Sequence, residues 1–347
     1  MRPRSPGKRI LDILDHRNVE KDKTIPAALF TTAAPLEVMN KCNTARPEAD
    51  HDPEKMAALA IAVHRLSGFE SISYPFDGTL IAEAFGCRIK WGKEDIPPAV
   101  LEGLDVPFED IDIPSDLLEN GRIPALFEAT RIIRKEIKDE AAIVCGLSGP
   151  VDLVSELIGM KSFLVLLLKE PGVAERLLNV ATEACILVAN KCLEEGADVV
   201  KFGDAVTSPD IVPPAMFIST IKPVYTKLVD SVKGKCVIHV CGKTDPIIGE
   251  LAECGFCGVS IEEDVEDLRG AVENVHEHSS VLIGNVSTSK TIYNGTPEEV
   301  RKEAMMAMEA GIDILAPGCG IAPQSPLVNL RAIVEARDEY STGTLYL

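Results

Sequence analysis

Aromatic side chains are scarce in this sequence. Its 347 residues include one Trp, five Tyr and ten Phe, although hydrophobic residues of all kinds make up 46% of the chain. A core of useful size is therefore available, but it must be built mainly from aliphatic side chains. Strands rich in aliphatic side chains suit a parallel sheet that is buried on both of its faces.

Long apolar runs are also missing. No stretch reaches the roughly 18 apolar residues that indicate a transmembrane helix, and the opening MRPRSPGKRILDIL lacks the apolar stretch of a signal peptide. We therefore expect a cytoplasmic protein with no membrane segment. In that compartment the ten cysteines are expected to be reduced thiols, and metal binding is then an option for some of them.

Positive charge is in short supply. The chain has 35 Lys and Arg against 54 Asp and Glu, which gives a formal net charge of −19. A nucleic-acid partner requires a basic surface, and so does docking on an anionic membrane. Neither partner is expected here, and the excess of acidic residues is interpreted as a solvated surface.

Short β-branched runs alternate along the chain with longer amphipathic stretches. Strands are predicted at Ala27–Phe30, Ser71–Tyr74, Ala142–Gly146, Val199–Phe202, Cys236–Cys241, Gly258–Ile261, Val281–Val286 and Ile312–Ala316. The clearest helical patterns are Pro53–Leu66, Ile123–Ile137, Val173–Glu195, Pro214–Val232, Thr244–Cys254, Val265–Val275, Pro297–Ala310 and Pro326–Arg337. This alternation predicts an α/β fold of the (β/α)8 TIM-barrel type. A doubly wound open sheet is the alternative, because a sequence alone does not show closure.

No linker rich in Pro, Gly or Ser divides the chain. Residues 1–347 are therefore expected to form a single barrel domain with an N-terminal extension. The segment from about Ala84 to Arg122 is rich in Pro, Asp and Glu. It is predicted to be an irregular insertion near the mouth of the barrel.

The fifth predicted strand carries two potential metal ligands. Because side chains alternate between the two faces of a strand, His239 and Cys241 point the same way at its carboxyl end. Active sites of barrels form at that end. Cys319 follows the eighth predicted strand in a turn with a glycine on each side, which in a closed barrel lies on the same rim. One imidazole and two thiolates form a known catalytic zinc set, with a fourth position for water or substrate.

Ordinary structural interpretations also exist. A buried Cys is most often a small hydrophobic residue, His239 can be a hydrogen-bonded core histidine, and the spacing between Cys241 and Cys319 is not itself a zinc signature. The CxxC at Cys254–Cys257 has no second pair and is interpreted as packing.

Several segments resemble the uroporphyrinogen decarboxylase superfamily and, within it, the methylcobalamin:coenzyme M methyltransferases. They are HVCGKTDPI (239–247), GVSIEE (258–263), IGNVST (283–288), NGTPEEV (294–300) and ILAPGCGIAPQSPLVNLRAIVEA (314–336), with weaker likeness in RPEADHDPEKMAALA (46–60), GLSGPVDL (146–153) and FGDAVTSPDIVPP (202–214). The resemblance implies a barrel, one zinc ion bound by His239, Cys241 and Cys319, and methyl transfer from a methylated corrinoid protein to coenzyme M, in methanogenesis from methylated compounds. The thiol would become nucleophilic by losing its proton at the metal.

The sequence departs from the decarboxylases after the first predicted strand. Those enzymes resemble one another in a basic, Arg-containing motif there, whereas this chain has Thr31, Thr32 and Ala33. A polycarboxylate substrate is therefore disfavoured. A metal-free decarboxylase remains one alternative, and a non-catalytic barrel that binds zinc or a corrinoid protein remains another.

Further polar residues are expected near the metal. Glu263 is predicted as the acid that occupies the fourth zinc position or supports His239, as the family likeness implies, whereas Glu262 is interpreted as a helix-start residue. Asp204 follows the fourth predicted strand and Asn285 lies in the seventh, so both are candidate catalytic residues at the mouth.

Overall fold

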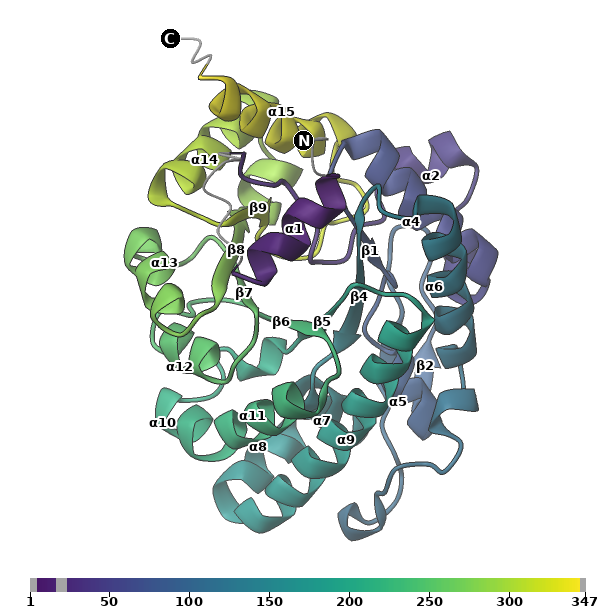
Figure 1. Cartoon of the computed structure of the whole chain (residues 1–347). Coiled ribbons are helices and arrows are strands. Elements are labelled where there is room, and N and C mark those ends of the chain that lie inside the picture. Colours follow the sequence, from purple (N-terminus) through teal and green to yellow (C-terminus); the bar gives the residue numbers. More distant parts are fainter. Residues whose placement is uncertain (1–4, 17–23, 344–347) are drawn as a thin grey trace.

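A ring of parallel strands forms the centre of the computed structural model, which describes residues 5–16 and 24–343 (Figure 1). Seven strands pair in the order β1-β4-β5-β6-β7-β8-β9, and every pair is parallel. Their bounds are β1 Ser71–Tyr74, β4 Ala142–Ser148, β5 Val199–Gly203, β6 Lys235–Val240, β7 Gly258–Ile261, β8 Val281–Val286 and β9 Ile314–Pro317. The alternating pattern of the sequence is thus confirmed for these strands.

The predicted first strand, Ala27–Phe30, is not a regular strand, yet the chain here closes the ring. The Ala28 N–H donates to the carbonyl of Leu315 in β9, with an N···O distance of 2.9 Å. On the other side, the Glu70 N–H donates to the carbonyl of Ala27 at 2.8 Å, just before β1 begins. The two ends of the seven-stranded sheet are therefore joined, which gives a TIM barrel rather than an open, doubly wound sheet.

The hydroxyl of Ser71 explains why this segment is not a strand. It accepts a hydrogen bond from the Leu29 N–H at 2.6 Å and donates to the Leu29 carbonyl at 3.0 Å. A side chain thus satisfies both polar groups of Leu29, which would otherwise pair with the backbone of the neighbouring strand. The sequence pattern correctly predicted a buried extended segment, but it did not reveal that a serine hydroxyl takes the place of the backbone partner.

The barrel interior is filled by small and branched aliphatic side chains. The interior cluster joins Ile10 and Leu14 of helix α1 (Pro6–Leu14) to residues from the strands, including Val144, Val199, Val237, Val281, Ile283, Ile314 and Ala316. Helix α1 therefore closes the amino end of the barrel, and Figure 1 shows it lying across the ring. The carboxyl end of the strands is left for a site.

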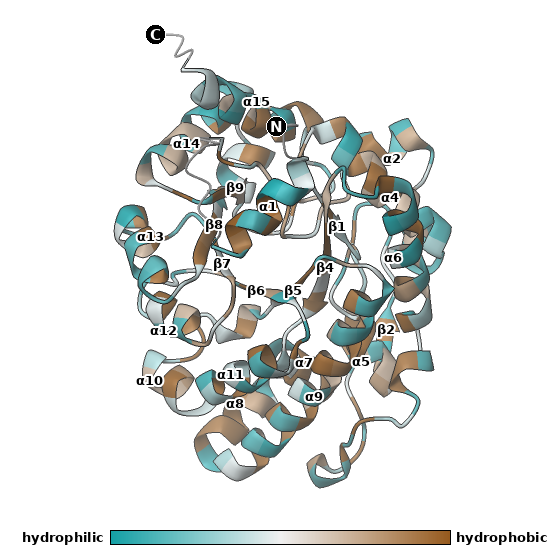
Figure 2. Ribbon diagram, in the orientation of Figure 1, coloured by the Kyte–Doolittle hydropathy of each residue, from teal (hydrophilic) through white to brown (hydrophobic). Residues whose placement is uncertain are grey.

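Helices surround the sheet, and their hydrophilic residues gather on outer faces, as Figure 2 shows for α6 and α13. The longer helices are α4 Pro53–Ser67, α6 Ile123–Ile137, α9 Pro171–Glu195, α11 Lys222–Ser231, α13 Leu268–Glu277, α14 Pro297–Ala310 and α15 Leu327–Thr342. Those predicted at Ile123–Ile137 and Pro297–Ala310 are confirmed to the residue. None of the helices in the described ranges is long and apolar enough to cross a membrane.

The predicted helix Pro214–Val232 is interrupted. A π-helical turn, η4 (Phe217–Ile221), separates α10 (Pro214–Met216) from α11. Pro223 follows this turn and has no N–H to donate to the preceding helical turn, which explains the change in helical register.

Shorter elements complete the chain. They are α2 Leu36–Cys42, α3 Glu48–His51, α5 Leu80–Phe85, α7 Pro150–Ile158, α8 Met160–Lys169, α12 Ile248–Glu253, η3 Ala205–Thr207 and η5 Thr288–Tyr293. Between α5 and α6 lie an antiparallel strand pair, β2 Arg88–Lys90 and β3 Ala99–Glu102, and two 3-10 turns, η1 Phe108–Asp110 and η2 Leu117–Glu119.

Candidate metal centre

Three distant side chains meet at the carboxyl end of the strands. His239 lies near the end of β6, Cys241 follows that strand directly, and Cys319 follows β9. The Sγ of Cys241 lies 3.5 Å from Nε2 of His239 and 3.8 Å from Sγ of Cys319. His239 is almost fully buried, whereas the two thiols are partly exposed.

The spacing of these atoms fits a tetrahedral zinc ion. Zinc binds sulfur at about 2.3 Å and imidazole nitrogen at about 2.0–2.1 Å, so a tetrahedral site has edges of about 3.8 Å between sulfurs and about 3.6 Å between sulfur and nitrogen. The observed separations of 3.8 Å and 3.5 Å match both edges. One nitrogen and two sulfur donors are also the ligand chemistry that zinc prefers.

Glycines give the two cysteine turns their shape. Gly242 follows Cys241 with a φ of +74°, in the left-handed region that glycine adopts most easily. A side chain on Gly318 would place its Cβ 3.1 Å from the Cα of Glu262, so a glycine here lets the turn that carries Cys319 approach the end of β7.

The carboxylate in this group belongs to Glu262 and not, as predicted, to Glu263, whose catalytic role stays a prediction. One ligand atom from each of His239, Cys241, Cys319 and Glu262 lies within 4.8 Å of the others. An Oε of Glu262 also accepts from the Gly242 N–H at 2.8 Å. Glu263 turns away.

Strand parity explains this reversal. Ser260 in β7 pairs in register with His239 and shares its face of the sheet, so Glu262, two residues later, continues on that face. Glu263 points to the other side, where it accepts a hydrogen bond from the Ser287 hydroxyl at 2.6 Å and pairs with Lys290 at 3.5 Å. The same alternation that identified His239 and Cys241 would therefore have identified Glu262.

The donor atoms perturb one another's ionisation. A hydrogen bond from Cys241 and the neighbouring His239 lower the pKa of Cys319, even though burial opposes this. The hydrogen bond to Cys319 and burial raise the pKa of Cys241. Burial and the contact with Cys319 raise the pKa of Glu262 to about 7. Negative charge is thus crowded at this position, and a bound cation would relieve the crowding.

The Nδ1 of His239 faces away from the thiols. It lies 3.2 Å from the hydroxyl of Ser260 on the adjacent strand. A partner at one ring nitrogen fixes both the tautomer and the orientation of the ring, which directs the other nitrogen to a metal. Sequence reasoning did not single out Ser260.

Asp204 lies beside the site and is fully buried. Its carboxylate accepts from the Asp152 N–H at 2.6 Å and from the Tyr225 hydroxyl at 2.7 Å. In the opposite direction, the Asp152 carboxylate accepts hydrogen bonds from the N–H groups of Ala205 and Val206, at 3.0 and 2.8 Å. Burial, and then the charge of Asp152, raise the pKa of Asp204 well above its ordinary value. Asp204 therefore fixes the start of α7, and its catalytic role stays a prediction.

The structure does not bring Asn285 into the group of four donors. It lies on β8 beside Ala316, which belongs to the barrel interior. A catalytic role for Asn285 also stays a prediction.

A cavity of about 230 Å³ adjoins the donor atoms. Its walls include His239, Cys241 and Cys319, together with Thr31, Asp77 and Lys201, which sequence reasoning did not select as site residues. Cavities that bind drug-sized ligands usually start at about 300 Å³, so this one suits a smaller molecule.

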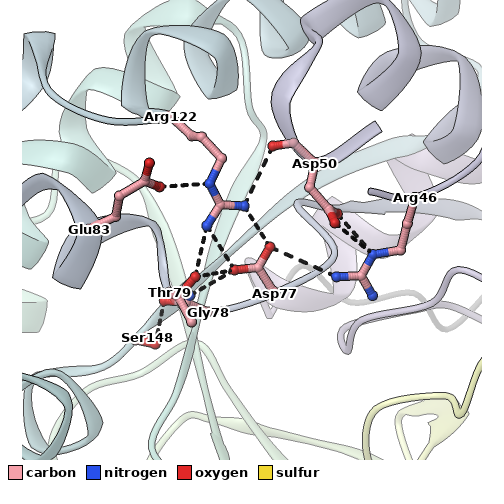
Figure 3. A network of polar contacts seen from close by, with 8 residues as sticks. All are labelled: Arg46, Asp50, Asp77, Gly78, Thr79, Glu83, Arg122 and Ser148. Carbon is pink, nitrogen blue, oxygen red and sulfur yellow. Dashed lines mark hydrogen bonds and ion pairs between the residues drawn. The ribbon is translucent and has the colours of Figure 1, made fainter. Parts of the chain in front are cut away.

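A buried polar network borders the cavity at Asp77 (Figure 3). Arg122 donates to both oxygens of Asp77, at 2.8 and 3.1 Å, and also to Thr79 at 2.7 Å and Glu83 at 2.7 Å. Arg46 approaches the same carboxylate at 4.0 Å. Asp77 is thus held rigidly by its own cations.

Comparisons with known proteins identify relatives over nearly the full length of the chain. The family model described as uroporphyrinogen decarboxylase (URO-D) matches residues 5–340. The methylcobamide:CoM methyltransferase MtaA of Methanosarcina barkeri is 39% identical over 96% of this chain and 97% of its own length. The corresponding MtbA of Methanosarcina acetivorans is 31% identical, over 97% of this chain and 98% of its own.

A solved structure is similar over nearly the whole chain. The methyltransferase from Methanosarcina mazei is 39% identical, covers 97% of this chain and 99% of its own, and superposes with a TM-score of 0.94. The chain therefore belongs to the uroporphyrinogen decarboxylase family and, within it, to the methylcobamide:CoM methyltransferases.

Proposed function

We propose that this chain is a zinc-dependent methyltransferase that moves a methyl group from a methylated corrinoid to the thiol of coenzyme M in methanogenesis from methylated compounds. The observation that carries the proposal is the convergence of His239, Cys241 and Cys319 on tetrahedral zinc distances beside a small cavity. The methyltransferases named above, which match over nearly the full length, support the reaction class.

His239, Cys241 and Cys319 would hold the zinc, and the Glu262 carboxylate would complete the donor set. When bound, zinc supplies Lewis acidity that keeps a substrate thiol deprotonated at neutral pH. Two thiolates, from Cys241 and Cys319, would offset the double positive charge of zinc and so leave a substrate thiolate electron-rich.

The chain's own residues supply orientation. Ser260 holds the His239 ring through Nδ1, and the Gly242 N–H holds the carboxylate of Glu262. Both contacts come from residues in or just after the strands, an arrangement that helps to hold the donor atoms in place. The walls of the cavity then set the direction from which a methyl donor approaches.

The reaction balances as a nucleophilic substitution. A lone pair of the substrate thiolate forms the new S–CH3 bond, and the Co–CH3 bond of the corrinoid breaks with both electrons remaining on cobalt. The products are a methyl thioether and a Co(I) corrinoid. We further propose that the corrinoid is carried by a separate protein that docks over the barrel mouth in the cytoplasm.

Methyl transfer can be tested directly. The purified chain is mixed with methylcobalamin and 2-mercaptoethanesulfonate, and loss of the Co–CH3 absorbance is followed while mass spectrometry detects the methyl thioether. Formation of the thioether at a rate proportional to enzyme concentration is expected. No transfer to any small thiol by the zinc-loaded chain would refute the proposal.

The ligand set has its own test. Cys319→Ala is expected to abolish stoichiometric zinc, measured by elemental analysis, together with activity. Cys42→Ala is the matched control, because Cys42 is also partly exposed but lies on α2, outside the donor group. If Cys319→Ala kept both zinc and activity, the assigned ligands would be wrong.

A further inference from the structure

A buried lysine faces the cavity beside the metal position. Lys201 on β5 is 7% exposed and lines the same cavity as His239, Cys241 and Cys319. Within the residues that the structure describes, its ammonium makes no hydrogen bond or ion pair. A buried charge without a partner is costly and is normally compensated. Burial lowers the pKa of Lys201, and the nearby charges of Cys319, Cys241 and Asp152 oppose this without forming an ion pair with it.

Two glycines make room for this side chain. A Cβ on Gly203 would lie 3.2 Å from Nζ of Lys201, and a Cβ on Gly146 would lie 3.5 Å from its Cε and 3.6 Å from Nζ. Gly203 pairs in register with His239. The lysine thus extends toward the carboxyl end of the barrel and brings its ammonium to the level of the histidine.

The carboxylates around the cavity are already engaged. Asp77 is bound by Arg122, and Asp152 accepts from two backbone N–H groups. Burial favours the neutral form of Asp204, whose pKa is raised. None of these carboxylates accepts a hydrogen bond from Lys201, so the ammonium is available to a ligand.

A second polar group in the cavity lacks a partner. The hydroxyl of Thr31 is buried and makes no hydrogen bond within the described part of the chain. Thr31 is 2% exposed and lines the same cavity as Lys201. The cavity therefore offers an ammonium and a hydroxyl, a donor set that suits an anionic oxygen group.

We infer that Lys201 binds the anionic end of the substrate thiol, with the Thr31 hydroxyl as a second donor. For coenzyme M this end is a sulfonate, which only two methylene groups separate from the reacting sulfur. The inference rests on the proposed function, and it assigns the residue that selects an anionic thiol over a neutral one. Lys201 would act on the tail of the substrate and not on the reacting atoms.

Arg46 is another buried cation close to the barrel mouth, and its surroundings differ from those of Lys201. Its Nε donates to both carboxylate oxygens of Asp50, at 2.9 and 3.1 Å, and the side chain approaches Asp77 at 4.0 Å. It lines a neighbouring cavity rather than the one that contains the donor atoms. Lys201 is therefore better placed than Arg46 to bind a small thiol in the cavity that contains the donor atoms.

Substrate selectivity tests this assignment. Methyl transfer from methylcobalamin is measured with 2-mercaptoethanesulfonate and with neutral 2-mercaptoethanol. The wild-type chain should prefer the sulfonate. Lys201→Met should lower the ratio of the two kcat/KM values about 10- to 100-fold, mainly through the KM of the sulfonate, as expected for losing a hydrogen bond to a charged group. Lys227→Met is the control, because Lys227 pairs with Glu183 on the outer helices.

An inhibitor separates this inference from the proposed function. Ethanesulfonate has the anionic end but no thiol, so its binding by calorimetry requires no methyl transfer. Wild-type protein should bind it, and Lys201→Met should bind it at least about tenfold more weakly. The assignment is overturned if wild-type protein shows no preference for the sulfonate thiol, or if Lys201→Met weakens both thiols equally. Absence of turnover combined with Lys201-dependent ethanesulfonate binding would instead refute only the proposed function.

Discussion

The hydrogen bond between Ser260 and His239 can be removed without touching a metal ligand. In Ser260→Ala, the His239 ring loses the partner that lies 3.2 Å from its Nδ1. Removing such a supporting contact typically costs about 10- to 100-fold in metal affinity. The observed distance is at the long end for a hydrogen bond, which favours the lower half of that range. We therefore expect zinc affinity to fall about 10- to 30-fold, with the same ligands still bound.

Competition with a chromogenic zinc chelator measures this change at constant pH. Ser280→Ala is a matched control, because Ser280 is as fully buried as Ser260 but its hydroxyl makes no hydrogen bond in the described part of the chain. The control should keep wild-type zinc affinity. If both variants lost affinity equally, or if neither did, the idea that Ser260 orients the ring would be untenable.

Three further predictions follow from the carboxylates near the mouth. Arg122→Met removes the cation that contacts both Asp77 and Glu83 and leaves the buried Asp77 with only Arg46, at 4.0 Å, so it should lower the free energy of unfolding by about 3–5 kcal/mol in urea titrations. Although burial opposes it, hydrogen bonding from Arg122 lowers the pKa of Asp77 below 3.8. The stability from this pair should therefore be complete above pH 3.8 and decline as pH falls below it, more steeply in wild-type protein than in Arg122→Met. Finally, Glu262→Gln should weaken zinc binding in the chelator assay, whereas Glu263→Gln should not. Equal effects would contradict the assignment of Glu262, and not Glu263, to the face of the sheet that carries His239.

Much of the fold could be predicted because the signals were local and periodic. At the start of α14, the Thr296 side chain accepts a hydrogen bond from the Glu299 N–H in a capping box. The Thr296-Pro297 pair in the sequence predicts a helix start at this point. Closure of the barrel was harder to predict from the sequence. It depends on backbone hydrogen bonds that join Ala27 to Glu70 and Ala28 to Leu315, and on the Ser71 hydroxyl that satisfies Leu29, contacts between distant residues that no local pattern encodes.

The candidate site divides in a similar way. Strand alternation was sufficient to place His239 and Cys241 on one face, and the family resemblance brought Cys319 to them. Lys201 was missed because a lysine inside a strand is ordinarily assigned to an exposed face. Its burial depends on Gly203 and Gly146, which lie on two strands, and only the register between those strands reveals the arrangement.

Charge in the cavity also explains how a chain of net charge −19 can accept an anionic substrate. The excess acids act through solvent, where about 0.15 M salt screens charges beyond roughly 8 Å, whereas Lys201 acts inside a buried cavity that is screened much less. The KM of coenzyme M, measured with free methylcobalamin, should therefore change little between low and moderate salt. A KM that rose steeply with salt would place the recognition of the sulfonate at the exposed rim and not at Lys201.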